Sequence, residues 1–343
     1  MKISICIPQY NRIAFLKISL AKLATQDYDN LEICISDDAS TDETEIEIKK
    51  LQRSYPFPIL YNRFSTNEGY DRNLRKSMEL ATGDYIFILG NDDTLSDDSA
   101  ISRLLNFLQT NHLPDVGFCN NTDFINTTEV SYRAKTSGIV GRGSSVALKY
   151  YSSFSFVAGL IFKRTAFNKV NTSKYDKSIY VQIYLAVRII TEGGTFFTYN
   201  EPLVYKDIRV NNEKANSYLD KLPRKKSDYK KLDAGLPSYT FVTAMAFKDA
   251  GIDYINYYYQ IIKRLYCFTY PFWLFDYRNN NARVAALGLK EGLALENFRL
   301  IDNFNNWQKA KLKIYYHLFS LGGLFTPTYL FNNMRNLLYK IAK

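Results

Sequence analysis

The stretch "FILGNDDTLSDDS" (residues 87–99) places two adjacent carboxylates directly after a run of apolar side chains. Residues 87–89 are typical of the end of a buried strand, and Gly90 ends that run. Two neighbouring aspartates are costly to keep ionised unless a positive charge lies between them. Asp92 and Asp93 therefore predict a divalent cation site, with a simple cap on the following turn as the structural alternative.

The same succession of short apolar runs and helical spacing fills the first 120 residues. Strand–helix alternation indicates right-handed crossovers and an α/β fold with a mostly parallel, Rossmann-like sheet flanked by helices. Continuously apolar strands indicate a sheet that is covered on both faces. The predicted strands are 3–8, 31–36, 57–62, 84–89 and 115–120, and the predicted helices are 12–26, 43–51, 69–81 and 96–110.

Beyond residue 121 the pattern is less regular. Pro202, after Glu201, predicts a turn between two short strands within 194–207, and the many glycines and serines of 136–145 predict a loop. The other predictions are a strand at 154–162, a helix at 177–192, a lysine-rich linker at 221–231 and an almost entirely helical region at 238–343.

Composition excludes several classes of protein. With 46% apolar and 23% charged residues, the chain is neither disordered nor of low complexity. Its four cysteines lie far apart in the sequence, which argues against a zinc site and favours reduced thiols in the cytoplasm. The N-terminus shows no signal-peptide pattern. Neither GxxxxGK[ST] nor GxGxxG is present, which argues against P-loop and dinucleotide-binding proteins. Both His112 and His317 lie outside the polar clusters described next, which argues against a histidine-based catalytic triad or metal site.

Three polar clusters follow predicted strands: "PQYNR" (8–12), "DDASTD" (37–42) and "NDD" (91–93). In an open parallel sheet, ligands bind beyond the carboxyl ends of the strands. We therefore expect the three clusters to line one crevice. Arg72, in "NEGYDRNL", could reach a phosphate there.

These residues resemble the family-2 glycosyltransferases of the GT-A fold. The matching stretches are "SICIPQYNR", "EICISDDASTDET", "NEGYDRN", "ATGDYIFILGNDD" and "NEPLVYKD", which together cover roughly residues 1–212. The resemblance implies inverting transfer of a sugar from a nucleotide diphosphate donor, a UDP-sugar, to an acceptor hydroxyl. Such an enzyme would use Mn²⁺ or Mg²⁺.

The resemblance also implies which residues bind the nucleotide. Pro8, Tyr10 and Asn11 would line the nucleotide pocket. Asp38 would contact the base, commonly uracil in this family, and Arg72 would lie near the nucleotide or the diphosphate.

The acidic stretch corresponds to the DXD motif of the family. Asp93 would be the main metal ligand, with Asp92 beside it. The first position of the motif is Asn91, which lowers the negative charge at the metal but keeps an oxygen ligand.

The catalytic base departs from the family pattern. The family usually has a Glu-Asp pair at the start of the helix before the closing strands, where this chain has Val181 and Gln182. Asp176 is the nearest carboxylate upstream, and Asp207 is the alternative after the closing strand. Asp176 could instead be a residue of a surface turn.

The C-terminal region carries most of the positive charge. Residues 255–343 contain twelve Lys or Arg against four Asp or Glu, and 314–331 contains no charged residue. The resemblance implies a GT-A domain at 1–215, with a nucleotide-sugar half (1–120) and an acceptor half (121–215), and the helical spacing beyond it predicts a helical region at 216–343. We expect that region to bind an anionic membrane surface, with a packed core or a homodimer contact as alternatives.

The predicted function is metal-dependent transfer of a sugar to a glycan or lipid-linked acceptor in polysaccharide biosynthesis, at the cytoplasmic face of the inner membrane. Two alternatives stay open. One is a sugar-nucleotide-binding or scaffold protein without the usual base. The other is a sugar nucleotidyltransferase, although "PQYNR" lacks the glycine-rich loop of that class. The scattered basic residues of the tail do not favour nucleic-acid binding.

Overall fold

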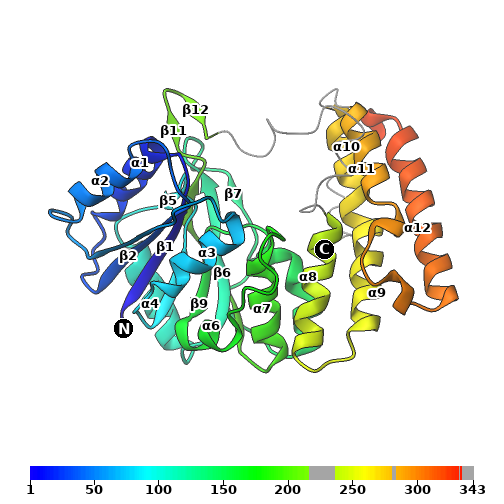
Figure 1. The fold of residues 1–343 in the computed structure, drawn as a ribbon, viewed down its shortest axis with the longest axis horizontal. Helices are drawn as coiled ribbons and strands as arrows, with labels where there is room; N and C mark the ends of the chain where they lie inside the picture. The colour runs from blue at the N-terminus through cyan, green and yellow to red at the C-terminus, as the bar shows by residue number, and fades with distance from the viewer. Residues whose placement is uncertain (216–235, 280–282, 332, 334–343) are drawn as a thin grey trace. The chain divides into compact units, whose positions relative to one another are not determined.

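The computed structural model describes residues 1–215, 236–279, 283–331 and 333 of the chain. The chain divides into two compact units, Met1–Ser217 and Tyr218–Lys343. The first is built around one large sheet, and the second is helical in its described part (Figure 1). We call them the α/β unit and the helical unit.

Four parallel strands form one half of the sheet. They are β1 (Ile3–Gln9), β2 (Leu31–Asp37), β3 (Ile59–Arg63) and β4 (Tyr85–Ile88), and they lie in the order β3-β2-β1-β4. Every residue of β2 and β4 is buried. This burial explains why these strands appear in the sequence as apolar runs without alternation, and the predicted strands are confirmed.

The other half of the sheet mixes strand directions. β9 (Leu160–Lys163) runs antiparallel between β4 and β6 (Val116–Asp123), and β10 (Phe196–Lys206) pairs in parallel with β6. The short β5 (Thr94–Leu95) follows the acidic stretch directly and pairs antiparallel with β10. This pairing brings the acidic stretch next to the end of β10. Two further short strands, β7 (Val130–Ser131) and β8 (Gly138–Gly141), pair with β6 and β10.

Helices alternate with the strands as predicted. α1 (Ile13–Leu23), α2 (Thr44–Leu51), α3 (Tyr70–Glu79) and α4 (Ala100–Thr110) follow β1, β2, β3 and β5, and α5 (Ser144–Tyr150), α6 (Arg164–Val170) and α7 (Val181–Thr191) follow later in the chain. The prediction of a helix start at Ser96 is wrong. Asp97 Oδ1 accepts from the N–H and Oγ of Ser99, and this turn delays α4 to Ala100.

Three other local predictions need correction. Residues 194–207 form one long strand and not two, because register shifts between Tyr199 and Val204 carry Pro202 through the sheet. Residues 136–145 contain β8 and the start of α5 in place of a loop. The predicted strand at 154–162 is reduced to β9, because Gly159 has a φ of +77°, which an extended strand does not adopt.

The helical unit contains α8 (Leu236–Asp249), α9 (Tyr254–Arg264), α10 (Tyr270–Asn279), α11 (Arg283–Gly292) and α12 (Asn306–Phe325), with a π-helical segment Leu265–Thr269 joining α9 to α10. Buried tyrosines dominate its interior: Tyr258, Tyr266, Tyr270 and Tyr316. The prediction of helices beyond residue 238 is confirmed for the described residues, whereas the predicted linker at 221–231 lies outside them. None of the described helices has the length and apolarity needed to cross a bilayer.

Candidate active site

Gln9, the last residue of β1, connects the polar ends of three strands. Its Nε2 donates to Thr44 Oγ1 at 2.9 Å, and its Oε1 accepts from Asn91 Nδ2 at 2.9 Å. Its carbonyl oxygen accepts from the backbone N–H of Asp38 at 2.9 Å and from Asn73 Nδ2 at 3.0 Å. The Gln9 side chain is fully buried. The ends of β1, β2 and β4 therefore lie together at one edge of the sheet.

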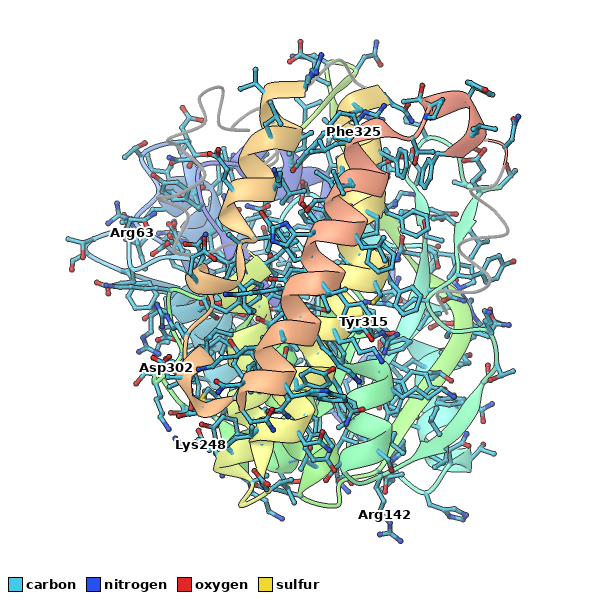
Figure 2. The ribbon with its side chains drawn as sticks, turned by 90° about the vertical axis from the view of Figure 1, so that its right-hand side faces the viewer. Arg63, Arg142, Lys248, Asp302, Tyr315 and Phe325 are labelled. Atoms are coloured by element: carbon cyan, nitrogen blue, oxygen red, sulfur yellow. The ribbon has the colours of Figure 1, made fainter. Side chains whose placement is uncertain are left out.

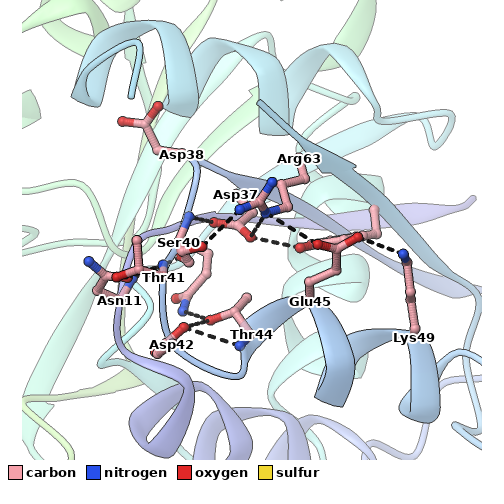
Figure 3. Close-up of polar contacts among 12 residues, drawn as sticks. Asn11, Asp37, Asp38, Ser40, Thr41, Asp42, Thr44, Glu45, Lys49 and Arg63 are labelled. Atoms are coloured by element: carbon pink, nitrogen blue, oxygen red, sulfur yellow. Dashed lines mark hydrogen bonds and ion pairs between the residues drawn. The ribbon is translucent and has the colours of Figure 1, made fainter. Parts of the chain in front are cut away.

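The loop after β1 is held against the loop after β2 (Figure 3). The N–H of Asn11 donates to Ser40 Oγ at 2.9 Å, and Asn11 Oδ1 accepts from the N–H of Thr41 at 2.7 Å. The N–H of Ile13 donates to Asp42 Oδ2 at 3.0 Å. Asn11 has a φ of +48°, which asparagine tolerates better than most residues. The two loops therefore form one connected polar wall.

Asp37 anchors this wall to the sheet. Its carboxylate is fully buried and accepts from the N–H of Ser40 at 2.9 Å and from the hydroxyl of Tyr61 at 2.7 Å. Arg63 completes the environment, with its Nε 3.7 Å from Asp37 Oδ2. Asp37 therefore has a structural role, and it turns the neighbouring Asp38 in the opposite direction, as Figure 3 shows.

Asp38 joins the end of β2 to the loop before α3. Its Oδ1 accepts from the N–H of Glu68 at 2.6 Å, and its Oδ2 accepts from the N–H of Gly69 at 3.0 Å. Gly69 has a φ of +88°, which a residue with a side chain rarely adopts. Burial raises the pKa of Asp38, while the two N–H groups lower it.

The other residues predicted to bind nucleotide lie in different surroundings. Pro8 is half-buried in β1, and Tyr10 is 44% exposed. Arg72 donates to both carboxylate oxygens of Glu79, at 3.1 and 3.0 Å, and its guanidinium lies 5.6 Å from the centre of the Phe64 ring. A contact between Arg72 and a phosphate would require this ion pair to open.

The acidic stretch forms a compact corner after β4. Asn91 and Asp93 are 8% and 6% exposed, and Arg12 Nη1 lies 3.2 Å from both Asn91 Oδ1 and Asp92 Oδ2. A Cβ on Gly90 would lie 2.5 Å from Asp93 Oδ2 and 3.2 Å from Asp92 Oδ1. An alanine at this position would therefore force the Asp93 carboxylate to move from where it lies.

The pKa values of Asp92 and Asp93 are raised at this corner. Burial raises the pKa of Asp93 to about 8, and the charges of Asp92 and Asp207 contribute. Burial also raises the pKa of Asp92, while Arg12 lowers it. Two buried carboxyl groups with raised pKa values thus lie beside the Arg12 guanidinium, an arrangement more typical of a functional site than of a stabilising one.

The chain that leaves β10 is bonded to the same corner. The N–H of Asp207 donates to Asp93 Oδ1 at 3.1 Å, and the N–H of Ile208 donates to the carbonyl of Asp92 at 2.8 Å. Asp207 has a φ of +62°. The hairpin of β11 (Arg209–Val210) and β12 (Glu213–Lys214) follows. Asp207, predicted as one of two alternative bases, therefore lies beside the predicted metal ligand.

Lys214 supplies a second cation at this end of the sheet. Its Nζ lies 2.7 Å from Asp207 Oδ2 and 3.5 Å from Asp123 Oδ2 at the end of β6. The pairing raises the pKa of Lys214. The ammonium group therefore partly neutralises the Asp207 carboxylate.

Asp176, the other predicted base, is held by Arg75 of α3. Arg75 Nε and Nη2 donate to the two carboxylate oxygens of Asp176 at 2.8 and 2.7 Å, and Nη1 donates to Asn171 and Glu79, both at 2.9 Å. Arg75 is only 3% exposed. Both oxygens of Asp176 are thus engaged, a geometry that favours a positioning role over proton transfer.

A second residue of α3, Asp71, caps the start of α7. Asp71 Oδ2 accepts from the N–H of Ile179 at 2.7 Å and from Ser178 Oγ at 3.1 Å, and Oδ1 accepts from the N–H of Val181 at 3.2 Å. The N-cap residue of α7, Tyr180, provides no side-chain cap. Burial raises the pKa of Asp71 to about 6. α3 therefore fixes both the loop that carries Asp176 and the helix that follows it.

Four residues at or near this site are absent from the predicted set: Gln9, Arg12, Asp71 and Lys214. Gln9 and Arg12 lie within the cluster "PQYNR" (8–12) that follows the first strand, so their place in the sequence could have identified them as residues of the site. Asp71 and Lys214 act on partners far away in the sequence, and no local pattern identifies them.

Comparisons with known proteins agree with the geometry. The family described as glycosyl transferase family 2 matches residues 4–170. Abequosyltransferase RfbV of Salmonella typhimurium is 32% identical over 222 residues, which are 60% of this chain and 66% of that protein. A relative from Campylobacter jejuni, GalNAc(5)-diNAcBac-PP-undecaprenol beta-1,3-glucosyltransferase, is 29% identical over 104 residues, 30% of this chain and 33% of that protein. The matched region is thus only a part of each relative.

Solved structures show the same fold. S. aureus TarS 1–349 in complex with UDP-GlcNAc gives a TM-score of 0.61 at 15% identity, covering 94% of this chain and 89% of that one. The complex of the same protein with UDP gives 0.59 at 14% identity, with the same coverage. The predicted GT-A architecture, a mostly parallel α/β sheet followed by helices, is confirmed. The chain belongs to glycosyl transferase family 2.

Proposed function

We propose that this protein transfers a sugar from a nucleotide diphosphate donor, a UDP-sugar, to a hydroxyl of a glycan or lipid-linked acceptor in polysaccharide biosynthesis. The observation that carries the proposal is the convergence of the strand ends at Gln9 on the acidic corner of Asp92 and Asp93. The relatives support the reaction class, since one is an abequosyltransferase and the other is a beta-1,3-glucosyltransferase named for GalNAc(5)-diNAcBac-PP-undecaprenol.

The residues at the corner fit a divalent cation such as Mn²⁺ or Mg²⁺. Burial raises the pKa values of Asp92 and Asp93, and the charge of Asp207 adds to both, so a bound cation would favour the ionised form of each carboxyl group. Hard oxygen ligands of this kind are those that both ions prefer. No set of three or more His, Cys, Asp or Glu side chains arranged for metal binding occurs within the described parts of the chain. We therefore infer that Asp93, with Asp92 and the Asn91 amide oxygen close by, would share the ion with diphosphate oxygens of the donor.

The wall formed by the loops after β1 and β2 is suited to the nucleoside. Its exposed members include Tyr10, whose ring can lie against a base, and Asn11. Asp38 holds the 67–69 loop through its two carboxylate oxygens, so it shapes the edge of this pocket and would contact the base from there. Arg72 would join the donor only after release from Glu79.

The transfer is a single displacement with inversion. The acceptor oxygen forms a bond to the anomeric carbon while the bond from that carbon to the phosphate oxygen breaks, and the electron pair leaves with UDP. The acceptor proton passes to a carboxylate oxygen. A bound cation would stabilise the charge that develops on the leaving diphosphate.

We favour Asp207 over Asp176 as the group that takes the proton. Asp207 is bonded through its backbone to the acidic corner, is 36% exposed, and forms an ion pair with Lys214. Both oxygens of Asp176 are occupied by a buried guanidinium. Asp176 would then position the loop before α7.

We further propose that the protein works at the cytoplasmic face of the inner membrane, where a lipid-linked acceptor would be found. The competing function is a sugar-nucleotide-binding protein that has lost its base. That protein would bind UDP-sugar and Mn²⁺ but would release no UDP when acceptor is added.

The test is UDP release and product formation by the full chain, with Mn²⁺ and a panel of UDP-sugars and glycan or polyprenyl-diphosphate acceptors. We expect Asp93→Ala to lower the rate by about 100-fold or more and to weaken Mn²⁺ binding measured by electron paramagnetic resonance. Asp29→Ala, at an exposed aspartate away from the corner, is the matched control. Wild-type activity in Asp93→Ala, or binding without turnover in the wild type with every donor and acceptor, would overturn the proposal.

A further inference from the structure

The long helix α12 has one face fixed in the core of the helical unit. Tyr316 donates to the carbonyl of Lys290 at 2.8 Å, and Ser320 Oγ lies 2.6 Å from the hydroxyl of Tyr270. Gly323 is also buried, and a Cβ there would lie 2.5 Å from Leu274 Cδ1. The inner face of α12 is therefore fully used in packing.

The opposite face of α12 is also apolar, but it is exposed. In Figure 2, α12 is the helix in front that rises to the labelled Phe325. At about 100° per residue, five bulky side chains lie within an arc of about 60°, and at 1.5 Å per residue they span about 27 Å. We call them the outer face: Trp307, Ile314, Leu318, Leu321 and Phe325, each 59–70% exposed.

Exposed apolar residues are concentrated on this part of the chain and are not spread evenly over the surface. Of the seventeen large apolar side chains exposed in the described residues, seven fall within Trp307–Leu330. A continuous apolar stripe of this length is typical of a binding surface. α12 therefore has two apolar faces. Folding buries the inner face, whereas the outer face stays exposed and is available to a partner.

The charges around the outer face indicate which partner. Lys311 borders the outer face, about 40° around the helix from Trp307, and its Nζ lies 3.2 Å from the centre of the Trp307 ring. From residue 306 to the end of the sequence there are six Lys or Arg and no Asp or Glu. A basic and apolar helix matches an anionic lipid surface, which offers negative headgroups above an apolar layer.

We infer that the outer face of α12 docks the protein on an anionic lipid bilayer, with the helix lying in the plane of the interface. No described helix is suited to cross a membrane. Docking of a second copy through the same face is the competing outcome that the test separates. The inference deepens the proposed function by adding a lipid surface beside a lipid-linked acceptor, but its test requires no turnover.

The test is sedimentation of the full-length chain with vesicles of phosphatidylcholine containing about 30% phosphatidylglycerol, against pure phosphatidylcholine. We expect Leu318→Asp/Leu321→Asp to lower the partition coefficient about tenfold or more. Lys311→Gln should lower it about fivefold on anionic vesicles. The matched control is Val284→Asp, which introduces a charge at a 51% exposed apolar residue of α11.

Retained folding of each variant is checked by its thermal melting curve, and its oligomeric state by analytical ultracentrifugation. Three outcomes would overturn the inference: wild-type partition in Leu318→Asp/Leu321→Asp, equal loss in Val284→Asp, or equal wild-type binding to neutral and anionic vesicles. Dissociation of a wild-type dimer by Leu318→Asp/Leu321→Asp, with lipid binding intact, would assign the face to self-association instead. Release of UDP from a soluble donor, measured without vesicles, tests the proposed function separately.

Discussion

Replacement of Asp71 by asparagine tests how α3 holds the acceptor side of the α/β unit. The Asp71 carboxylate is 1% exposed and accepts three hydrogen bonds from Ser178, Ile179 and Val181. The amide of the Asp71→Asn variant would keep one carbonyl oxygen and place an NH₂ group against one of the donors. We expect this substitution to cost about 1–2 kcal/mol of unfolding free energy near pH 7.5.

The pH dependence of this cost has a definite sign. Burial raises the pKa of Asp71 from 3.8 to about 6. Protonation therefore stabilises the folded state, and this contribution is complete below the unfolded pKa and is lost as the pH rises through about 6. Between pH 7.5 and pH 5 the wild type gains about 1.4 kcal/mol from this group, whereas the Asp71→Asn variant gains nothing. The difference in unfolding free energy between the two proteins should grow by that amount.

The assay is urea unfolding at both pH values, followed by circular dichroism and by hydrogen exchange of the segment that contains Ile179 and Val181. Hydrogen exchange is needed because both tryptophans, Trp273 and Trp307, lie in the helical unit and do not report on the α/β unit. Ser178→Ala is the control, since it removes one hydrogen bond but keeps the carboxylate and its pH dependence. Parallel pH dependences of wild type and Asp71→Asn would refute the reasoning.

Three further predictions concern the acidic corner and its supports. Gly90→Ala should weaken Mn²⁺ binding about tenfold or more, because its Cβ would collide with Asp93 Oδ2; unchanged affinity in a calorimetric titration would count against the metal site. Lys214→Met removes the cation beside Asp207 and should strengthen Mn²⁺ binding, because one positive charge near the acidic corner is lost; weaker or unchanged Mn²⁺ affinity in a titration would contradict this expectation. Arg75→Met should destabilise the α/β unit by about 3–5 kcal/mol, because it leaves the partly buried carboxylate of Asp176 unpaired. A melting temperature equal to that of the wild type would show that this ion pair does not stabilise the fold.

Local sequence patterns determined much of the α/β unit. Apolar runs located β1, β2, β4 and β6, because strands buried on both faces need no polar alternation, and β-forming residues located the partly buried β3. The spacing of apolar residues located α1, α3 and α4, and a helix-start signal with acidic residues in the first turn located α2. The candidate acidic corner was also predictable, because the residues after a buried strand necessarily lie at the edge of the sheet.

The continuity of β10 and the extent of β9 were not predictable in this way. Pro202 is a turn signal in isolation, yet pairing with β6 and β5 on its two sides carries the chain through as one strand. The sequence alone likewise does not say which of the two apolar faces of α12 is buried. Packing of Gly323 against Leu274 decides that question.

The sequence by itself determined where the strands end and which polar residues follow them, since these properties depend on neighbouring residues in the chain. Only the tertiary structure decided how the carboxylates are used. Asp176 is paired with Arg75, Asp71 caps α7, and Asp207 is bonded to Asp93, all across about 100 residues of sequence or more. The protonation and hydrogen bonding of a carboxylate depend on burial and on nearby charges, which exist only once distant segments have packed together.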